Sequence, residues 1–349
     1  MLGVSQFPVF CCPQCKGSLN FTGEEYSCPR CDRKYPVVLG IPDFRVFPDS
    51  YISYEDDYKK ARFLIEKAEA NNLDFKGLVR LYWSITPEVP EDRAERFMKR
   101  TFALVAKGVE NLKEIEAHSR KKDQTGFNAV LEIGCGTGGF LVAAKAQFKQ
   151  VVGIDIAFRW LVIAKKRLDE LNLNVPLVCA CAEALPFEEE TFDLIVAENV
   201  LEHVRDQEDM LKECRRLLDS NGVLFLTTPN RFGLTPEPHV RVWGVGFLPR
   251  KWMGRYVKLI KGIPYRHLRV LSFFEISKLL KHVSFQNYRI LFPSLPQQEL
   301  KNLSALETFQ VAMYEALRKT PFIRSCLYII GPSFHILCYA NKNRNSGES

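Results

Sequence analysis

The stretch that decides the fold is VLEIGCGTGGF at residues 130–140, where an apolar strand runs directly into a glycine-rich turn. Glycine has no side chain and tolerates a positive φ, so such a turn allows the backbone to approach a nucleotide-like ligand closely. Asp155 ends the next apolar run, QVVGID, where a carboxylate can bind ribose hydroxyls. The pattern predicts a nucleotide-type ligand beside this turn.

The identity of that ligand depends on Glu132, two residues before the first glycine of the loop. The loop glycines are Gly134, Gly136, Gly138 and Gly139. They satisfy both the G-x-G-x-x-G pattern of dinucleotide binding and the pattern G-x-G-x-G, so spacing alone does not choose between cofactors. A carboxylate repels the pyrophosphate of a dinucleotide, whereas S-adenosylmethionine (SAM) has no phosphate and carries a sulfonium and an ammonium group. The sequence therefore predicts SAM.

Short apolar runs alternate with amphipathic stretches from residue 129 onward. The candidate strands are AVLEIG, QVVGID, VPLVCA, FDLIVA and GVLFLTT, and the stretches between them carry apolar residues at helical spacing. Strand–helix alternation of this kind predicts a doubly wound α/β domain with a parallel sheet covered on both faces. We expect three parts: a zinc ribbon at 8–47, a helical linker or lid at 48–127, and the α/β domain at 128–340.

Two cysteine pairs stand near the start of the chain, CPQC at 12–15 and CPRC at 28–31. Each pair can place two thiolates on one tight turn, and two such turns can close a tetrahedral site around zinc. The predicted ligands are Cys12, Cys15, Cys28 and Cys31. Four thiolates leave no position open for water, so the metal is expected to be structural. A redox pair and small buried cysteines are the alternatives; Cys11 is interpreted as a bystander.

The segment CCPQCKGSLNFTGEEYSCPRCDRKYPVVLGIPDF resembles the short zinc-ribbon proteins that serve as methyltransferase activators. The matching features are the paired cysteines, Lys16-Gly17, Tyr35-Pro36 and the closing GIPDF. The resemblance implies that the ribbon can recruit a protein partner. Because the ribbon is a separate part of the chain, loss of its metal is expected to leave SAM binding largely intact.

A second resemblance covers residues 128–230. The stretch CAEALPFEEETFDLIVAENVLEHV at 181–204, with VLEIGCGTGG and VVGIDIA before it, is similar to class I SAM-dependent methyltransferases of the small-molecule type (type 11). The resemblance implies a seven-stranded Rossmann-like sheet with its last strand antiparallel. By position, it implies that Glu132 lies near the methionine moiety, that Gly134, Cys135, Gly136 and Gly138 approach SAM, that Asp155 binds ribose, and that Ile156, Cys181 and Ala182 contact adenine. Members often carry Asp where this chain has Cys181.

Two histidines are candidates for the catalytic base, because methyl transfer to oxygen usually needs one and histidine titrates near neutral pH. His203 follows the fourth strand in ENVLEH, and His239 follows the fifth in TPNRFGLTPEPH. For each of them, the alternative is a histidine that is satisfied by hydrogen bonds within a loop or helix cap.

The chain's net charge of +7 is concentrated after the fifth strand. Twelve Lys or Arg stand between Arg231 and Arg289 against two acidic residues, and the basic insertion spans about 231–270. Within it, PRKWMGRYVKLIK at 249–261 predicts a basic amphipathic helix with a tryptophan, which suits an anionic membrane surface. Packing of the apolar side onto the domain is the alternative.

Three functional hypotheses follow. The first is O-methylation of a small-molecule or lipid-linked acceptor, such as a glycan, polyprenyl or quinone-type compound. The second is methylation of a ribosomal RNA base, which would use the basic segment for phosphate contacts. AENVLEHV stands where an Asn-Pro-Pro-Tyr-type motif would be expected for that chemistry. The third is an interaction module with an inert methyltransferase domain, against which the complete SAM loop argues.

Composition and the pattern of apolar runs indicate the expected cellular location of the protein. Hydrophobic residues make up 46% and charged residues 26% of the chain, as in ordinary globular proteins. No export signal is seen at the start, and no apolar run is long enough to span a bilayer. Eleven cysteines without an export signal suggest thiols and metal ligands. We expect a cytoplasmic protein with peripheral contact at the inner face of the membrane.

Overall fold

The computed structural model describes residues 7–86, 89, 91–119, 127–292, 305–320 and 324–340. Its contacts divide the chain into two units. Unit 1 comprises Met1–Val196, Lys212–Val223 and Ala340–Ser349, and unit 2 comprises Ala197–Leu211 and Leu224–Tyr339. The ribbon and the predicted SAM loop belong to unit 1, whereas both candidate histidines and the basic insertion belong to unit 2.

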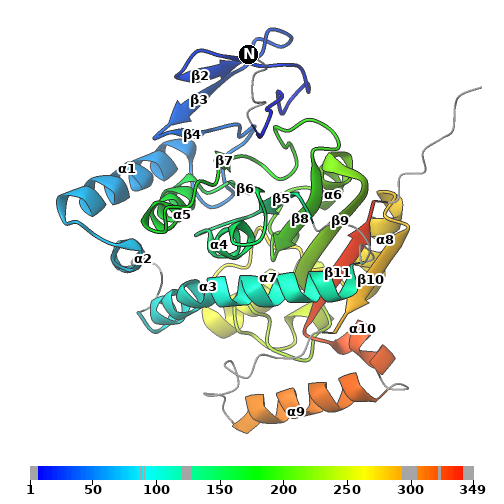
Figure 1. Cartoon of the computed structure of the whole chain (residues 1–349). Coiled ribbons are helices and arrows are strands. Elements are labelled where there is room, and N and C mark those ends of the chain that lie inside the picture. The colour runs from blue at the N-terminus through cyan, green and yellow to red at the C-terminus, as the bar shows by residue number, and fades with distance from the viewer. Residues whose placement is uncertain are drawn as a thin grey trace, which may run out of the picture. The chain divides into compact units, whose positions relative to one another are not determined.

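The main sheet confirms the predicted fold class. Its seven strands have the order β10-β11-β9-β8-β5-β6-β7 (Figure 1). The strands are β5 (Ala129–Ile133), β6 (Gln150–Asp155), β7 (Leu177–Cys179), β8 (Phe192–Glu198), β9 (Leu218–Pro229), β10 (Asn287–Leu291) and β11 (Ser333–Tyr339). β6 pairs in parallel with β5 and with β7, and β10 pairs antiparallel with β11. All five residues of β5 are buried, as expected for a central strand of a sheet covered on both faces.

The chain opens with a small antiparallel sheet of β1 (Asn20–Phe21), β2 (Glu25–Ser27), β3 (Lys34–Val38) and β4 (Ile41–Pro42). Its apolar centre is one ring, Phe44, which is fully buried and lies against Phe10, Tyr26 and Tyr35 at centroid distances of 5.1–5.3 Å. So small a core stabilises little by itself, which is the physical reason to expect a metal here.

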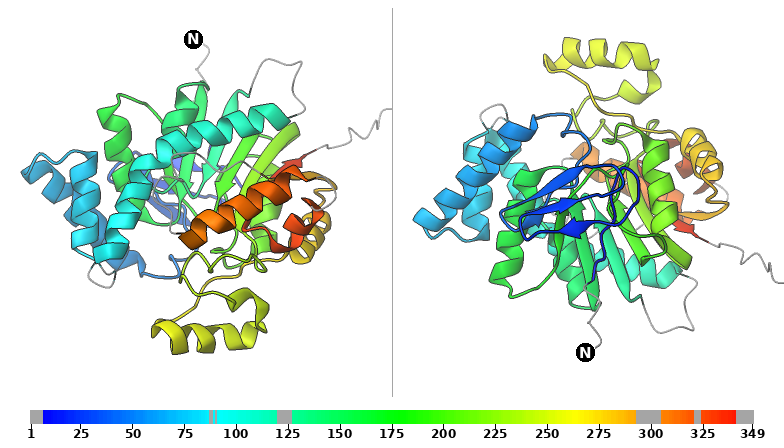
Figure 2. Two further views of the ribbon diagram at one scale, coloured as in Figure 1. Left: turned by 90° about the horizontal axis from the view of Figure 1, so that it is seen from below. Right: turned by 90° about the horizontal axis from the view of Figure 1, so that it is seen from above.

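Three helices follow the small sheet: α1 (Tyr54–Ala70), α2 (Phe75–Ser84) and α3 (Glu91–His118). Ser53 and Asp74 cap the first two by accepting hydrogen bonds from the third helical amide. Figure 2 shows α1 and α2 beside α5 (Phe158–Glu170), and a shared apolar cluster joins them. α3 packs so closely on α4 (Gly139–Lys145) that a Cβ at Gly139 would overlap Leu104. These helices therefore cover unit 1 next to the glycine loop.

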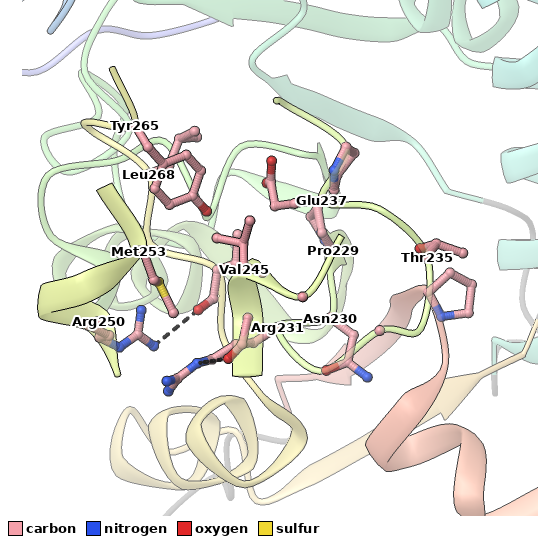
Figure 3. Close-up of a pocket in the computed structure, with 16 residues that line it drawn as sticks. Pro229, Asn230, Arg231, Thr235, Glu237, Val245, Arg250, Met253, Tyr265 and Leu268 are labelled. Carbon is pink, nitrogen blue, oxygen red and sulfur yellow. Dashed lines mark hydrogen bonds between the residues drawn. The ribbon is translucent and has the colours of Figure 1, made fainter. Parts of the chain in front are cut away.

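Unit 2 contains the short helix η1 (Val245–Phe247), α7 (Arg250–Lys261), α8 (Phe273–His282), α9 (Ala305–Lys319), η3 (Arg324–Cys326) and α10 (Leu327–Ile330); α6 (Gln207–Leu217) bridges the two units in sequence. α7 begins after Pro249 and ends before Gly262, its C-cap, whose φ of 70° suits glycine. Between α7 and the loop after β9 lies a small pocket, lined by Glu237, Met253, Tyr265 and Leu268 among others (Figure 3).

The apolar residues of α7 do not all lie on one buried side. Met253 and Val257 are buried with Val240, Val242 and Val245, whereas Trp252 and Ile260 are 53% and 54% exposed. A second apolar face of α7 is therefore open to solvent beside the basic residues of the helix. Within the described residues, no helix is both long enough and apolar enough to cross a membrane.

Candidate functional site

The glycine loop between β5 and α4 has the geometry that the sequence predicts. Gly134, Gly136 and Gly138 all have positive φ, at 73°, 49° and 73°, a conformation that L side chains rarely adopt. Gly138 is the residue before α4, so the turn delivers the helix N-terminus directly after the strand. A Cβ at Gly136 would meet no atom within 4 Å. The backbone at this glycine thus faces open space, as a loop that receives a ligand must.

Asp155 fixes that loop. Its Oδ2 accepts a hydrogen bond of 2.8 Å from the amide of Gly136, and its Oδ1 accepts one of 2.8 Å from the amide of Ala157. The two predicted cofactor residues Gly136 and Asp155 are therefore in direct contact. Burial raises the pKa of this carboxyl to about 6, against the lowering effect of the two amides. Asp155 is poised to accept further hydrogen bonds while remaining largely ionised at neutral pH.

The other predicted cofactor residues lie on β5, in the glycine loop and directly after β6 and β7. Glu132 is buried within β5 and lies opposite Gly153 of β6. Ile156 directly follows Asp155, and the amide of Ala180 donates to the Asp155 carbonyl at 3.1 Å, which ties the β6 turn to the segment before Cys181. Cys135 and Ala182 are buried as well.

Cys181, the departure from the family pattern, is fully buried. Its thiol donates to the carbonyl of Phe47 at 3.4 Å, and burial raises its pKa to about 11. The thiol is therefore neutral at physiological pH. It serves to hold the segment that leaves the ribbon, a role that the sequence did not suggest.

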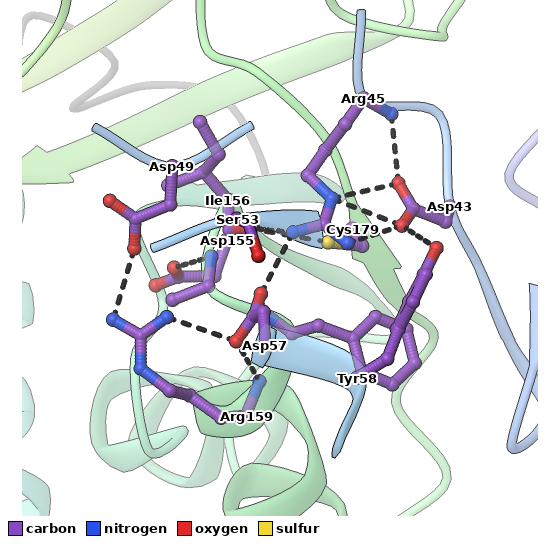
Figure 4. A network of polar contacts seen from close by, with 12 residues as sticks. Asp43, Arg45, Asp49, Ser53, Asp57, Tyr58, Asp155, Ile156, Arg159 and Cys179 are labelled. Carbon is purple, nitrogen blue, oxygen red and sulfur yellow. Dashed lines mark hydrogen bonds and ion pairs between the residues drawn. The ribbon is translucent and has the colours of Figure 1, made fainter. Parts of the chain in front are cut away.

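That segment carries buried charged residues that sequence reasoning missed (Figure 4). Arg45 is completely buried and donates to Asp43, to Asp57 at 2.8 Å, and to the carbonyl of Ile156 at 3.1 Å. Asp57, on α1, also accepts from the amide of Phe158 at 2.9 Å, at the start of α5. Arg45 thus joins the ribbon exit, α1 and the turn that follows Asp155.

A second arginine extends the network along α5. Arg159 donates to Asp57 at 2.9 Å and to Asp49 at 3.0 Å. Asp57 and both guanidinium groups are almost excluded from solvent. Each charge in the network is therefore paired, which is the condition under which burial is tolerated. The only sequence motif that included a residue of this network was GIPDF, which contains Asp43 and was matched as part of the ribbon.

The four ribbon cysteines converge. Their sulfur atoms lie within 4.8 Å of one another, with Cys12–Cys31 at 3.6 Å and Cys15–Cys28 at 3.4 Å. Thiolates about 2.3 Å from a tetrahedral zinc lie about 3.8 Å apart, so the residues fit the metal. The hydroxyl of Tyr35 lies 3.2 Å from the Cys12 sulfur. Burial alone would raise the pKa of the Cys12 thiol. Hydrogen bonds from Tyr35 and from the backbone have a larger, opposite effect, and together they lower this pKa to about 6.

The ribbon is attached to the rest of unit 1 at both ends. Cys11, interpreted as a bystander, is buried; its amide donates to the Pro186 carbonyl at 3.0 Å and its thiol to that of Phe187 at 3.1 Å. The amide of Phe44 donates to the carbonyl of Cys179, at the end of β7, at 2.8 Å. The ribbon therefore extends the strand edge that leads to the predicted adenine side.

In unit 2, the two candidate histidines lie together. The rings of His203 and His239 are 4.9 Å apart, edge to face. Glu237 holds His239 by accepting from Nδ1 at 2.6 Å. The adjacent carboxyl of Glu202 is 1% exposed, and burial raises its pKa to about 7. The sequence named both histidines, but did not single out Glu202 or Glu237 as their partners.

Comparison with known proteins identifies methyltransferases as similar to the part of the chain that contains the glycine loop. Residues 131–226 match the family described as "Methyltransferase domain". Ubiquinone biosynthesis O-methyltransferase of Coxiella burnetii is 37% identical over 103 residues, which cover 29% of this chain and 44% of the relative. The Bartonella quintana enzyme of the same name is 32% identical over 129 residues, covering 37% and 49%. The chain contains a class I SAM-dependent methyltransferase domain.

The methyltransferase match is limited to part of each protein, because the chain spans less than half the length of these curated relatives. Among solved structures, phosphoethanolamine N-methyltransferase 2 of Haemonchus contortus is 16% identical, with a TM-score of 0.43 over 67% of this chain and 51% of that one. Geranyl diphosphate C-methyltransferase of Streptomyces coelicolor is 18% identical, with a TM-score of 0.43 over 66% and 74%.

Proposed function

We propose that the protein binds SAM at the glycine loop and transfers its methyl group to a hydroxyl of a small or lipid-linked acceptor. The observation that carries the proposal is the open, positive-φ loop at Gly136, held by Asp155 at 2.8 Å. SAM supplies the electrophilic methyl group. Asp155 would hold the ribose, Glu132 the cationic methionine end, and Ile156 and Ala182 the adenine. A glycan, polyprenyl or quinone-type compound is the acceptor class we favour, in keeping with the names of the relatives.

His203 and His239 are the proposed bases for the acceptor hydroxyl. The short bond from Nδ1 of His239 to Glu237 would fix that ring and leave Nε2 as the nitrogen that accepts a proton, as general-base catalysis requires. The hydroxyl proton would pass to a ring nitrogen while the oxygen attacks the methyl carbon and the sulfonium leaves as a thioether. Positioning and exclusion of water supply much of the rate in such displacements.

The direct test uses labelled SAM with the purified protein and separate lipid, RNA and polar small-molecule extracts. We expect label in the lipid or small-molecule fraction, and none with an Asp155→Ala variant. Label confined to RNA would replace the proposal by methylation of an RNA base. A protein that binds SAM but labels no fraction would support an inert domain that serves for interaction.

We further propose that the ribbon cysteines hold one structural zinc ion. Cys28→Ser is expected to lose the metal in elemental analysis and to lower the affinity for SAM several-fold, because Asp43 and Arg45 lie in the last part of the ribbon and Arg45 holds Ile156. This reverses the independence expected from sequence. The control is Cys326→Ser, an exposed thiol outside the cluster. Native protein without zinc would contradict the proposal.

SAM affinity should depend on pH through Asp155. With its pKa raised to about 6, the carboxyl is ionised above that value and protonated below it. A protonated carboxyl accepts fewer hydrogen bonds, so affinity should fall as the pH falls through 6, by about tenfold between pH 8 and pH 5. Calorimetry across this range checks the expectation. An affinity that is flat with pH would show that the ionised carboxylate is not needed.

Peripheral contact with an anionic membrane is proposed for α7. Trp252, Leu259 and Ile260 are 53%, 82% and 54% exposed, beside the exposed Lys258. Flotation with acidic vesicles should show binding that weakens as salt rises. Exchange of Trp252 and Ile260 for Ala should reduce it at low salt, whereas Phe21→Ala, an exposed ring of the ribbon, should not. Equal binding to neutral vesicles would contradict the charge contribution.

A further inference from the structure

Glu202, His203 and His239 form a second group with the composition of a metal site. One side-chain oxygen or nitrogen from each lies within 4.8 Å of the others. The first two residues follow β8, and His239 comes from the loop after β9, so separate segments of unit 2 bring them together. The ribbon cysteines are the other such group among the described residues.

The carboxyl of Glu202 is the strongest sign of a ligand. Its side chain is fully excluded from solvent, and Oε2 accepts from the Thr228 hydroxyl at 3.0 Å. Oε1 has no hydrogen-bond partner within the described part of the chain. It lies 3.8 Å from Nε2 of His239, which is too long for a hydrogen bond. Burying a carboxylate oxygen without a partner is costly, so this geometry favours an occupant that bridges the gap.

His239 is oriented as a metal ligand usually is. Nδ1 lies 2.6 Å from Oε1 of Glu237, while Oε2 of Glu237 accepts from the amides of His239 and Val240 at 2.9 Å each. With its proton directed from Nδ1 to Glu237, the imidazole presents the Nε2 lone pair to the side of Glu202. A carboxylate behind a histidine fixes the tautomer and raises the basicity of the liganding nitrogen.

We propose that Glu202, His203 and His239 bind one divalent cation. Two ligands about 2.1 Å from one ion can lie up to about 4.2 Å apart, and the 3.8 Å separation falls within that limit. Two imidazole nitrogens and one carboxylate oxygen suit Zn²⁺, Mn²⁺ or Fe²⁺ better than Ca²⁺. Three protein ligands leave positions open for water or for an oxygen ligand.

If the protein methylates a hydroxyl as proposed above, the cation would also take part in that reaction; this step rests on the proposed function. An acceptor hydroxyl in an open position of the cation would be held there, and its pKa would be lowered, so that its proton could pass to water at neutral pH. His203 and His239 would then act as ligands of the cation in place of a base. The acceptors that benefit most are compounds with two neighbouring oxygens, because both can bind the same ion.

Mn²⁺ is the probe for this site, because hard cations compete poorly for the thiolates of the ribbon. Titration followed by electron paramagnetic resonance of free Mn²⁺ should give one bound ion per chain. His239→Gln and Glu202→Gln should each weaken binding by at least tenfold. The matched control is His282→Gln, which removes an exposed histidine that lies 3.2 Å from Glu208 in the same unit. Unchanged melting curves establish that the variants are folded.

The outcomes separate the site from the proposed function. Absence of Mn²⁺ binding by the native chain, or binding unchanged in Glu202→Gln and His239→Gln, overturns the site. If either variant fails to fold, His203→Gln provides the same test. Mn²⁺ binding by a chain that methylates nothing leaves the site in place and removes the proposed function. Methyl transfer by a chain that binds no Mn²⁺ removes the cation site and leaves the proposed function in place.

Discussion

Asp57→Ala is expected to be the most destabilising single substitution in unit 1. The side chain is fully buried and pairs with Arg45 at 2.8 Å and Arg159 at 2.9 Å. It also accepts from the amides of Phe158 at 2.9 Å and Arg159 at 3.2 Å, and so caps α5 from another helix. Its removal leaves two buried guanidinium groups with less compensation. Breaking a buried pair in this way costs about 3–5 kcal/mol of the free energy of unfolding.

Thermal denaturation measures this loss, which should lower the midpoint by about 6–20 °C for a domain of this size. Glu55→Ala is the matched control, since it removes a carboxylate from the same turn of α1. Glu55 is exposed and pairs only at the surface with Lys59, so the change should be about 0.5 kcal/mol or less. Equal effects of the two substitutions would mean that the network adds no stability.

The contrast between Asp57 and Glu55 shows where sequence reasoning ends. Both belong to the charged run YEDDYKK, and nothing in the run distinguishes the buried carboxylate from the exposed one. Arg45 lies 12 residues from Asp57, and Arg159 lies 102 residues away. From the sequence alone, such a run predicts a solvated helix face. Charge partners this distant become visible only when the tertiary structure brings them together.

The parts that could be predicted depend on local patterns. The strand that ends at Ile133, the glycines of positive φ and the aspartate at the end of β6 follow one another within a short stretch, so spacing was enough to identify them. The cysteine pairs were recognised in the same way. Helical periodicity alone puts Trp252 and Met253 on the same apolar side of α7, but Trp252 is exposed and Met253 is buried. A helix between two environments does not follow a single apolar stripe.

Asp155→Asn should have the largest effect on SAM binding. The carboxylate has both oxygens at 2.8 Å from amides and would receive the ribose hydroxyls of SAM in addition. The amide group of Asn keeps the shape but has one acceptor oxygen and no charge. Losing hydrogen bonds to a charged group costs about 1.5–3 kcal/mol, so the dissociation constant should rise about 10- to 100-fold in calorimetry.

Asp193→Asn distinguishes loss of the ribose acceptor from general damage to the strand. Asp193 accepts from the amides of Asn128 at 2.8 Å and Ala129 at 3.1 Å, at the other end of β5 from the glycine loop. The same substitution there disturbs a similar pair of backbone bonds without touching the loop. We expect SAM affinity within about twofold of native for Asp193→Asn. If both variants lose SAM to the same degree, Asp155 acts through the stability of the domain, and the ribose contact must be assigned to another residue.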